Sequence, residues 1–124
     1  ISIFMNKALS GEFPVIYGDG RQSRDFVFVG DVVQALISAA ISASAPGKVF
    51  NVGTGKSLTI SGLWEMIAAL SGCGAKPVNK PSRPGDIPHS LSAIDFAAAD
   101  LGFVPRVSLE SGLGLTLDWY RVRS

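Results

Sequence analysis

Short strand-like runs alternate along this chain with helical stripes of apolar residues. Each stripe repeats at intervals of three and four residues, the spacing of one helix face. The predicted strands are 15–17, 24–29, 49–52 and 76–80, and the predicted helices are 1–9, 31–41, 60–71, 94–101 and 109–120. This order predicts a small mixed α/β module of short strands and about five helices, with too few strands for a complete doubly wound sheet.

Residues that start and stop helices support this division. Asp31 is predicted to cap the second helix, and Thr59 or Ser61 the third, since short polar side chains satisfy free N–H groups there. Gly72 follows the third helix, where glycine commonly ends one. No capping residue precedes Ile1. The first stripe is therefore expected to be the inner part of a helix, as in a fragment.

Composition narrows the class of protein. The formal net charge of +1 provides no field that would draw the chain to nucleic acid or to a membrane. Apolar residues make up 47% and charged residues 17%, which indicates surface meant for burial against something else. A single cysteine, Cys73, excludes an intrachain disulfide and favours the cytoplasm. The apolar run 35–45 is too short to span a bilayer.

Several common catalytic and cofactor motifs are absent from the sequence. A phosphate-binding P-loop ending at Gly55-Lys56-Ser57 would need a glycine where Phe50 stands. The G-x-G turns at 18–20 and 53–55 both lack the third glycine of a dinucleotide fingerprint. One histidine and one cysteine exclude ordinary zinc spacing. The histidine, His89, is interpreted as a loop residue hydrogen-bonded to backbone rather than as a catalyst.

Two arginines are the strongest candidates for ligand contacts. Arg24 is predicted to lie on a strand face, and Arg83 lies in the proline-rich loop 81–88. A guanidinium group matches phosphate oxygens in a bidentate manner and stays charged at any relevant pH. Asp25 follows Arg24 directly, so its side chain should point to the opposite strand face and leave the charge of Arg24 unpaired by Asp25. From the residues alone, ordinary salt bridges to Asp86 or Asp31 are equally good explanations of these arginines.

Three blocks of sequence, in this order and spacing, resemble a known family. They are Val15 to Val29, Val49 to Gly55 and Arg83 to Asp86. Together they resemble the C-terminal, sugar-nucleotide-binding part of the extended short-chain dehydrogenases, and most nearly the UDP-hexose 4-epimerases. The resemblance implies that 1–124 is a single nucleotide-sugar-binding domain whose N-terminal NAD-binding Rossmann half is absent. Within the middle block, Gly53 is interpreted as a fold marker rather than as a ligand contact.

The resemblance also implies roles for individual residues. Arg24 and Arg83 would contact the nucleotide diphosphate, and Asp86 would accept hydrogen bonds from the ribose hydroxyls. The strand from Val15 to Tyr17 would line the base pocket, with backbone groups at the uracil edge and the Tyr17 ring near the uracil face. An ordinary core position is an equally good explanation of Tyr17.

The family's catalytic tyrosine and lysine, spaced four residues apart, are not found here. Tyr17 is followed four residues later by Arg21, and Tyr120 by Ser124. We therefore expect no catalytic, cofactor or metal site in this chain alone, although NAD serves the parent family. The expected ligand is a UDP-sugar, or a dTDP-sugar, and the expected partner is the missing Rossmann half. Alternatives are a stand-alone binding module, a dimerising interaction module, or the same portion of a nucleotide-sugar dehydratase.

Overall fold

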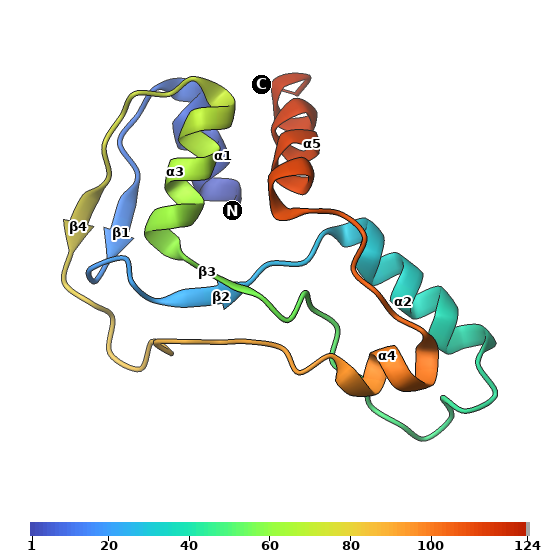
Figure 1. Cartoon of the computed structure of the whole chain (residues 1–124). Helices are drawn as coiled ribbons and strands as arrows, with labels where there is room; N and C mark the ends of the chain where they lie inside the picture. Colours follow the sequence, from blue (N-terminus) through green and yellow to red (C-terminus); the bar gives the residue numbers. More distant parts are fainter. Residues whose placement is uncertain (124) are drawn as a thin grey trace.

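Two pairs of three-residue strands and five helices make up the fold in the computed structural model, which describes residues 1–123 (Figure 1). The elements are α1 (Ser2–Ser10), β1 (Val15–Tyr17), β2 (Ser23–Asp25), α2 (Val29–Ile41), β3 (Ser57–Thr59), α3 (Ile60–Ser71), β4 (Val78–Lys80), α4 (Asp95–Leu101) and α5 (Leu109–Arg121). β1 pairs with β4 in parallel, and β2 pairs with β3 in antiparallel orientation. The predicted α/β class with about five helices is confirmed.

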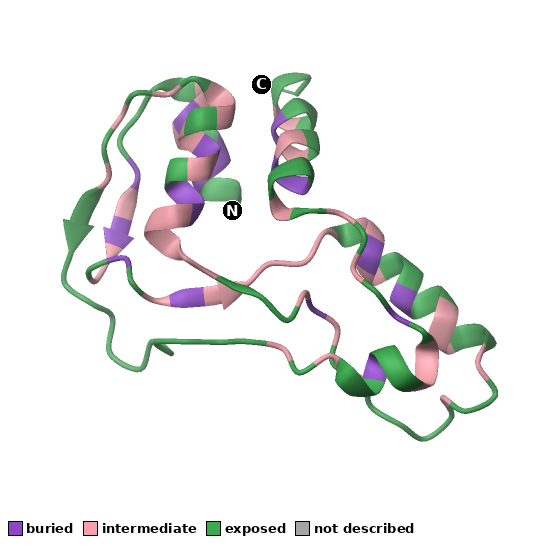
Figure 2. Cartoon of the chain, viewed as in Figure 1, coloured by how far each residue is buried: buried purple, intermediate pink, exposed green. Residues whose placement is uncertain are grey.

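The apolar side chains gather in two clusters rather than one. The larger cluster lies where α1, α3 and α5 contact one another, and its fully buried members include Met5, Leu63 and Ile67. The smaller cluster joins α2 to α4 through Ala35 and Ala97. Figure 2 shows the buried positions concentrated in the three-helix part and scattered elsewhere. The extended segments around β2 and β3 connect the two parts.

Two predicted strands differ from the structure. The strand predicted at 24–29 is limited to Ser23–Asp25, the residues that pair with β3, and α2 begins at Val29. Residues 49–52 form no strand, and Val49 is 86% exposed. A strand needs a hydrogen-bonded neighbour, and within residues 1–123 no strand pairs with this segment. The prediction of a buried strand at 49–52 is therefore wrong for this chain.

The helix caps lie where the sequence predicts them, with one exception. The Thr59 hydroxyl accepts a hydrogen bond of 3.0 Å from the Gly62 N–H at the start of α3, and Gly72 ends that helix with φ 75°. The exception is Asp31, which does not cap α2. Its buried carboxylate instead accepts the N–H groups of Arg106 and Val107, each at 3.1 Å. Asp31 therefore joins α2 to the segment that precedes α5.

The apolar stripe of α2 faces outward. Leu36 is 65% exposed and Ile41 82% exposed, whereas Ala35 is buried. The only charged residue of this helix is the buried Asp31. A helix that is apolar on nearly every side is usually enclosed by other structure. No helix within the described residues has the length and apolar character needed to cross a membrane.

Candidate functional site

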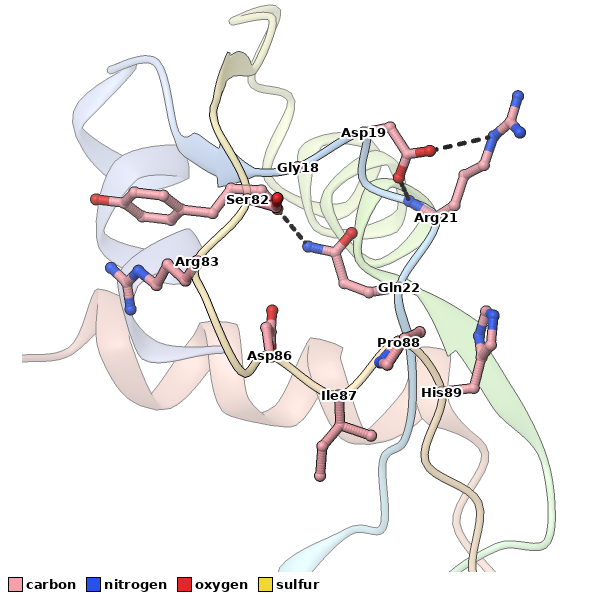
Figure 3. Close-up of a pocket in the computed structure, with 11 residues that line it drawn as sticks. Gly18, Asp19, Arg21, Gln22, Ser82, Arg83, Asp86, Ile87, Pro88 and His89 are labelled. Carbon is pink, nitrogen blue, oxygen red and sulfur yellow. Dashed lines mark hydrogen bonds and ion pairs between the residues drawn. The ribbon is translucent and has the colours of Figure 1, made fainter.

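A cavity of about 570 Å³ opens between the turn that follows β1 and the proline-rich loop that follows β4 (Figure 3). The parallel pairing of β1 with β4 places Tyr17 opposite Lys80, so both strands end at the same edge. The Gly18 N–H donates to the Lys80 carbonyl at 2.8 Å, and the Asn79 side chain donates to the Gly18 carbonyl at 2.7 Å. These bonds hold the turn and the loop side by side.

The turn at 18–22 is fixed from several directions. The Gln22 side-chain amide donates to the Tyr17 carbonyl at 2.6 Å, which closes the turn. Gly20 has φ 79°, and a Cβ at this position would lie 1.9 Å from the Ser61 hydroxyl at the start of α3. A side chain there would be strained by the positive φ and would require the Ser61 hydroxyl to rotate away. The turn is therefore a rigid wall of the cavity.

Arg83 lies over the face of Tyr17. Its guanidinium carbon is 3.8 Å from the centre of the Tyr17 ring, which is the geometry of a cation–π contact. The guanidinium also lowers the pKa of the Tyr17 phenol, through a hydrogen bond first and through its charge second. The predicted base-stacking ring and the predicted phosphate-binding arginine thus contact each other.

Arg24 reaches the rim of the cavity from β2. Its Nη2 lies 2.9 Å from Oδ1 of Asp86, and its Nη1 donates to the Ser23 carbonyl at 2.8 Å. The Arg24 side chain is 27% exposed and that of Asp86 is 42% exposed, so this ion pair faces solvent on one side. One of the salt bridges considered from the sequence is therefore present, between the two groups expected to bind diphosphate and ribose.

Asp25 points away from the cavity, as the strand alternation predicted. Its carboxylate accepts N–H groups from Thr54 and Gly55, each within 3.0 Å, and a third from Ser92 at 3.3 Å. Partial burial raises the pKa of Asp25, but the hydrogen bonds from these three residues outweigh that effect and hold the pKa below its ordinary value. Asp25 therefore does not pair with Arg24, whose ion-pair partner is Asp86.

Three of the five predicted binding residues line the cavity, namely Tyr17, Arg83 and Asp86. Arg24 contacts the site through its pair with Asp86. Val15 lies farther back in β1, opposite Val78, and does not line the cavity.

Other residues that line the cavity were not predicted. Gln22 and Ser82 are the clearest of them. The only sequence signal for Gln22 is its place just after the Asp19-Gly20 turn, which predicts a turn but not a wall. Arg21 also belongs to the lining, yet Figure 3 shows its side chain extending toward Asp19 and away from Arg83.

His89 has a structural partner in this arrangement. Its Nδ1 lies 3.0 Å from the Ser23 hydroxyl, and the two residues form a parallel β-bridge. The predicted partner was a backbone group, whereas the structure gives a side-chain hydroxyl. Across residues 1–123, no group of three His, Cys, Asp or Glu side chains could hold a metal ion.

The predicted residues at the site are the Tyr17 ring, the guanidinium groups of Arg24 and Arg83, and the Asp86 carboxylate. Guanidinium groups bind phosphate oxygens, a ring stacks on a planar base, and a carboxylate accepts hydrogen bonds from a diol. The arrangement can bind and orient a ligand that has an anionic centre beside a planar group.

Comparisons with known proteins agree with this chemistry. A profile described as NAD dependent epimerase/dehydratase family matches residues 1–53. The chain is 37% identical over its whole length to UDP-glucose 4-epimerase of Mycolicibacterium smegmatis, of which it covers 39%. It is 34% identical over 98% of its length to dTDP-glucose 4,6-dehydratase of Streptomyces niveus, of which it covers 36%.

Solved structures give the same result. UDP-glucose 4-epimerase from Thermotoga maritima, crystallised with UDP-glucose, matches 98% of this chain and 39% of its own length, with a TM-score of 0.93 and 39% identity. The chain therefore spans less than two fifths of the length of the relatives it matches. The resemblance predicted from the three sequence blocks is confirmed, because the chain matches a portion of proteins of the NAD dependent epimerase/dehydratase family.

Proposed function

We propose that this chain is the nucleotide-sugar-binding portion of an NAD-dependent sugar-nucleotide epimerase, and that it does not carry out the reaction alone. The single observation that carries the proposal is the convergence of Tyr17, Arg24, Arg83 and Asp86 on one cavity. These residues come from two segments more than 50 positions apart in the sequence. Their side chains match the base, the diphosphate and the ribose of one nucleotide.

The base would lie at the end of β1. The Tyr17 ring offers an aromatic face there, and Arg83 now covers it at 3.8 Å. When the nucleotide binds, Arg83 would move from the ring to the diphosphate while staying in the same cavity. The backbone at Val15 would complete the base pocket from the strand behind. UDP is the proposed nucleotide ahead of dTDP.

The diphosphate would take Arg24 from its present partner. A bidentate phosphate contact is stronger than the single 2.9 Å contact that Asp86 provides. Asp86, once released, can accept hydrogen bonds from the two ribose hydroxyls. The same two residues thus form an ion pair in the free chain and separate ligand contacts in the complex.

The described residues do not fit NAD. The glycine turn at 53–55 is the nearest match to a dinucleotide-binding turn, since N–H groups there could hold a phosphate. In this structure the Thr54 and Gly55 N–H groups both donate to the Asp25 carboxylate. A phosphate would have to displace that carboxylate. We therefore propose that NAD is held by the remaining part of the parent protein.

The exposed apolar face of α2 favours binding of another polypeptide to this chain. Leu36 and Ile41 are largely exposed, and the helix presents no exposed charge that would favour water. We propose that the Rossmann half of the parent enzyme covers this face. We also propose, from the single cysteine, that the protein is cytoplasmic. A homodimer formed through the same face is the second candidate, and the same exposed apolar helix supports it. A dehydratase parent is a further candidate, given the relationship to dTDP-glucose 4,6-dehydratase.

Calorimetric titration of the purified chain with UDP tests the proposal, with NAD as a parallel ligand. We expect saturable binding of UDP and none of NAD. Arg24→Ala and Arg83→Ala should each weaken UDP binding by about 1.5–3 kcal/mol, the range of a charge-assisted contact. Arg121→Ala is the matched control, because Arg121 pairs with Asp118 on α5 and not with the cavity.

The outcomes separate the candidates. Equal affinity of all three variants would remove the diphosphate assignment. Absence of UDP binding by a folded chain would leave the interaction module as the better proposal. Addition of a separately expressed Rossmann half from a relative should restore epimerase activity if the chain is the missing portion of an enzyme. Sedimentation of the chain alone reports whether the α2 face forms a dimer instead.

A further inference from the structure

Asp25 is the most completely hydrogen-bonded carboxylate described in this chain. Four donor groups reach it: the Thr54 N–H and hydroxyl, the Gly55 N–H and the Ser92 N–H. None of the three residues that supply them is near Asp25 in sequence. Gly53 closes the remaining side, since a Cβ there would lie 2.6 Å from Oδ2 of Asp25. This carboxylate joins three separate segments of the chain.

One of these segments continues into the candidate site. Residues 81–94 contain Arg83 and Asp86 and lie in no helix or strand. The segment is attached to β2 at successive points along its length. Ser23 accepts the Ser90 N–H at 3.0 Å and donates its own N–H to the Pro88 carbonyl at 2.9 Å. Asp25 provides the last attachment, at Ser92.

The two sides of β2 therefore act on the same segment. Arg24 contacts it from the cavity side through Asp86, and Asp25 contacts it from the other side through Ser92. Loss of the attachment at Ser92 would leave only the Ser23 bonds to Pro88 and Ser90 to hold this segment, and with it Asp86, beside Arg24. We propose that Asp25 is a positioning residue for nucleotide binding, which fixes the Asp86-bearing segment against β2 and so sets the geometry of Arg24 and Asp86. This inference rests on the proposed function, because it concerns the same site.

Asp25→Asn is the direct test, because it keeps the shape of the side chain. It removes the negative charge and replaces one of the two oxygens that accept the four donor groups. We expect the dissociation constant for UDP to rise by about tenfold or more, the effect of losing a charge-assisted contact. Asp100→Asn is the matched control. Asp100 pairs with Lys48 in the part of the chain formed by α2 and α4, and it does not line the cavity. This control should bind UDP as the unaltered chain does.

A double-mutant cycle separates positioning from general loss of structure. If Asp25 acts through Arg24, the loss of affinity caused by Asp25→Asn should be several-fold smaller in an Arg24→Ala background. A simple destabilisation would instead multiply the two losses. An unchanged affinity in Asp25→Asn, or losses that multiply, would overturn the inference.

Hydrogen exchange of the ligand-free chain gives a readout that does not depend on UDP. The amides of 86–92 should exchange faster in Asp25→Asn than in Asp100→Asn, and equal exchange would overturn the inference. A chain that fails to bind UDP but shows this difference would contradict the proposed function while supporting the role of Asp25 in positioning the segment. If Asp25→Asn does not fold, Thr54→Val removes the hydroxyl that donates to Asp25 and accepts the Lys56 N–H, keeps the Thr54 N–H, and should raise exchange at the same amides.

Discussion

Replacing Gly53 by alanine should destabilise the chain although only one methyl group is added. Gly53 is buried, and its new Cβ would lie 2.5 Å from the Cβ and hydroxyl of Ser92 and 2.6 Å from Asp25. Forcing a methyl group into a packed site costs about 1–3 kcal/mol. Relief of the contact would move the Asp25 oxygen that binds Gly55, at a cost of roughly 1 kcal/mol or more for a lost hydrogen bond. We expect Gly53→Ala to lower the free energy of unfolding by about 2–4 kcal/mol.

Urea unfolding followed by tryptophan fluorescence and circular dichroism measures this loss. Trp64 is 2% exposed within the larger cluster, so its fluorescence reports loss of that core. Gly74→Ala is the matched control, since Gly74 is exposed and its added Cβ would meet nothing within 4 Å. The control should change stability by less than about 0.5 kcal/mol. Equal midpoints for the two variants would refute the reasoning and remove the proposed close packing around Asp25.

Three further predictions concern stability. The folded-state pKa of Asp25 is lowered, so its stabilising effect is present above its ordinary pKa and is lost as the pH falls through the folded-state value. The stability difference between the unaltered chain and Asp25→Asn should therefore shrink in unfolding curves recorded at successively lower pH. Thr59→Ala removes the acceptor of the Gly62 N–H and should cost about 0.5–2 kcal/mol in urea unfolding. Leu36→Gln should change the free energy of unfolding by less than about 0.5 kcal/mol but reduce binding of a dye that detects exposed apolar surface.

Local patterns in the sequence account for most of the helices. The spacing of apolar residues and the flanking caps locate α3 closely, and the predicted range 109–120 lies within α5, because a helix satisfies its own backbone hydrogen bonds and needs no remote partner. Gly72 stops α3 where predicted, since glycine adopts the left-handed conformation without strain. The arginine-bearing blocks located the candidate site, although Val15 proved to lie behind the cavity.

Strands and buried carboxylates depend on residues far away, and the sequence does not specify those partners. Residues 49–52 have the composition of a strand, yet a strand forms only where another lies beside it. Asp31 lies where a helix cap is expected. Its carboxylate oxygens instead accept the N–H groups of Arg106 and Val107, which lie 75 and 76 positions later. The bonds of Asp25 to the segments at 54 and 92 could not be predicted for the same reason.

The groups proposed to bind a nucleotide contact one another in this structure, and these contacts affect the net affinity expected of the site. Arg24 donates to Asp86, and Arg83 covers Tyr17. A diphosphate would therefore replace protein contacts, and its net gain is the difference between the two sets. The existing contacts also hold both guanidinium groups near their proposed positions, which reduces the side-chain entropy lost on binding. Removal of either arginine then measures both effects together, so the expected losses of affinity describe a net exchange and not the full strength of a phosphate contact.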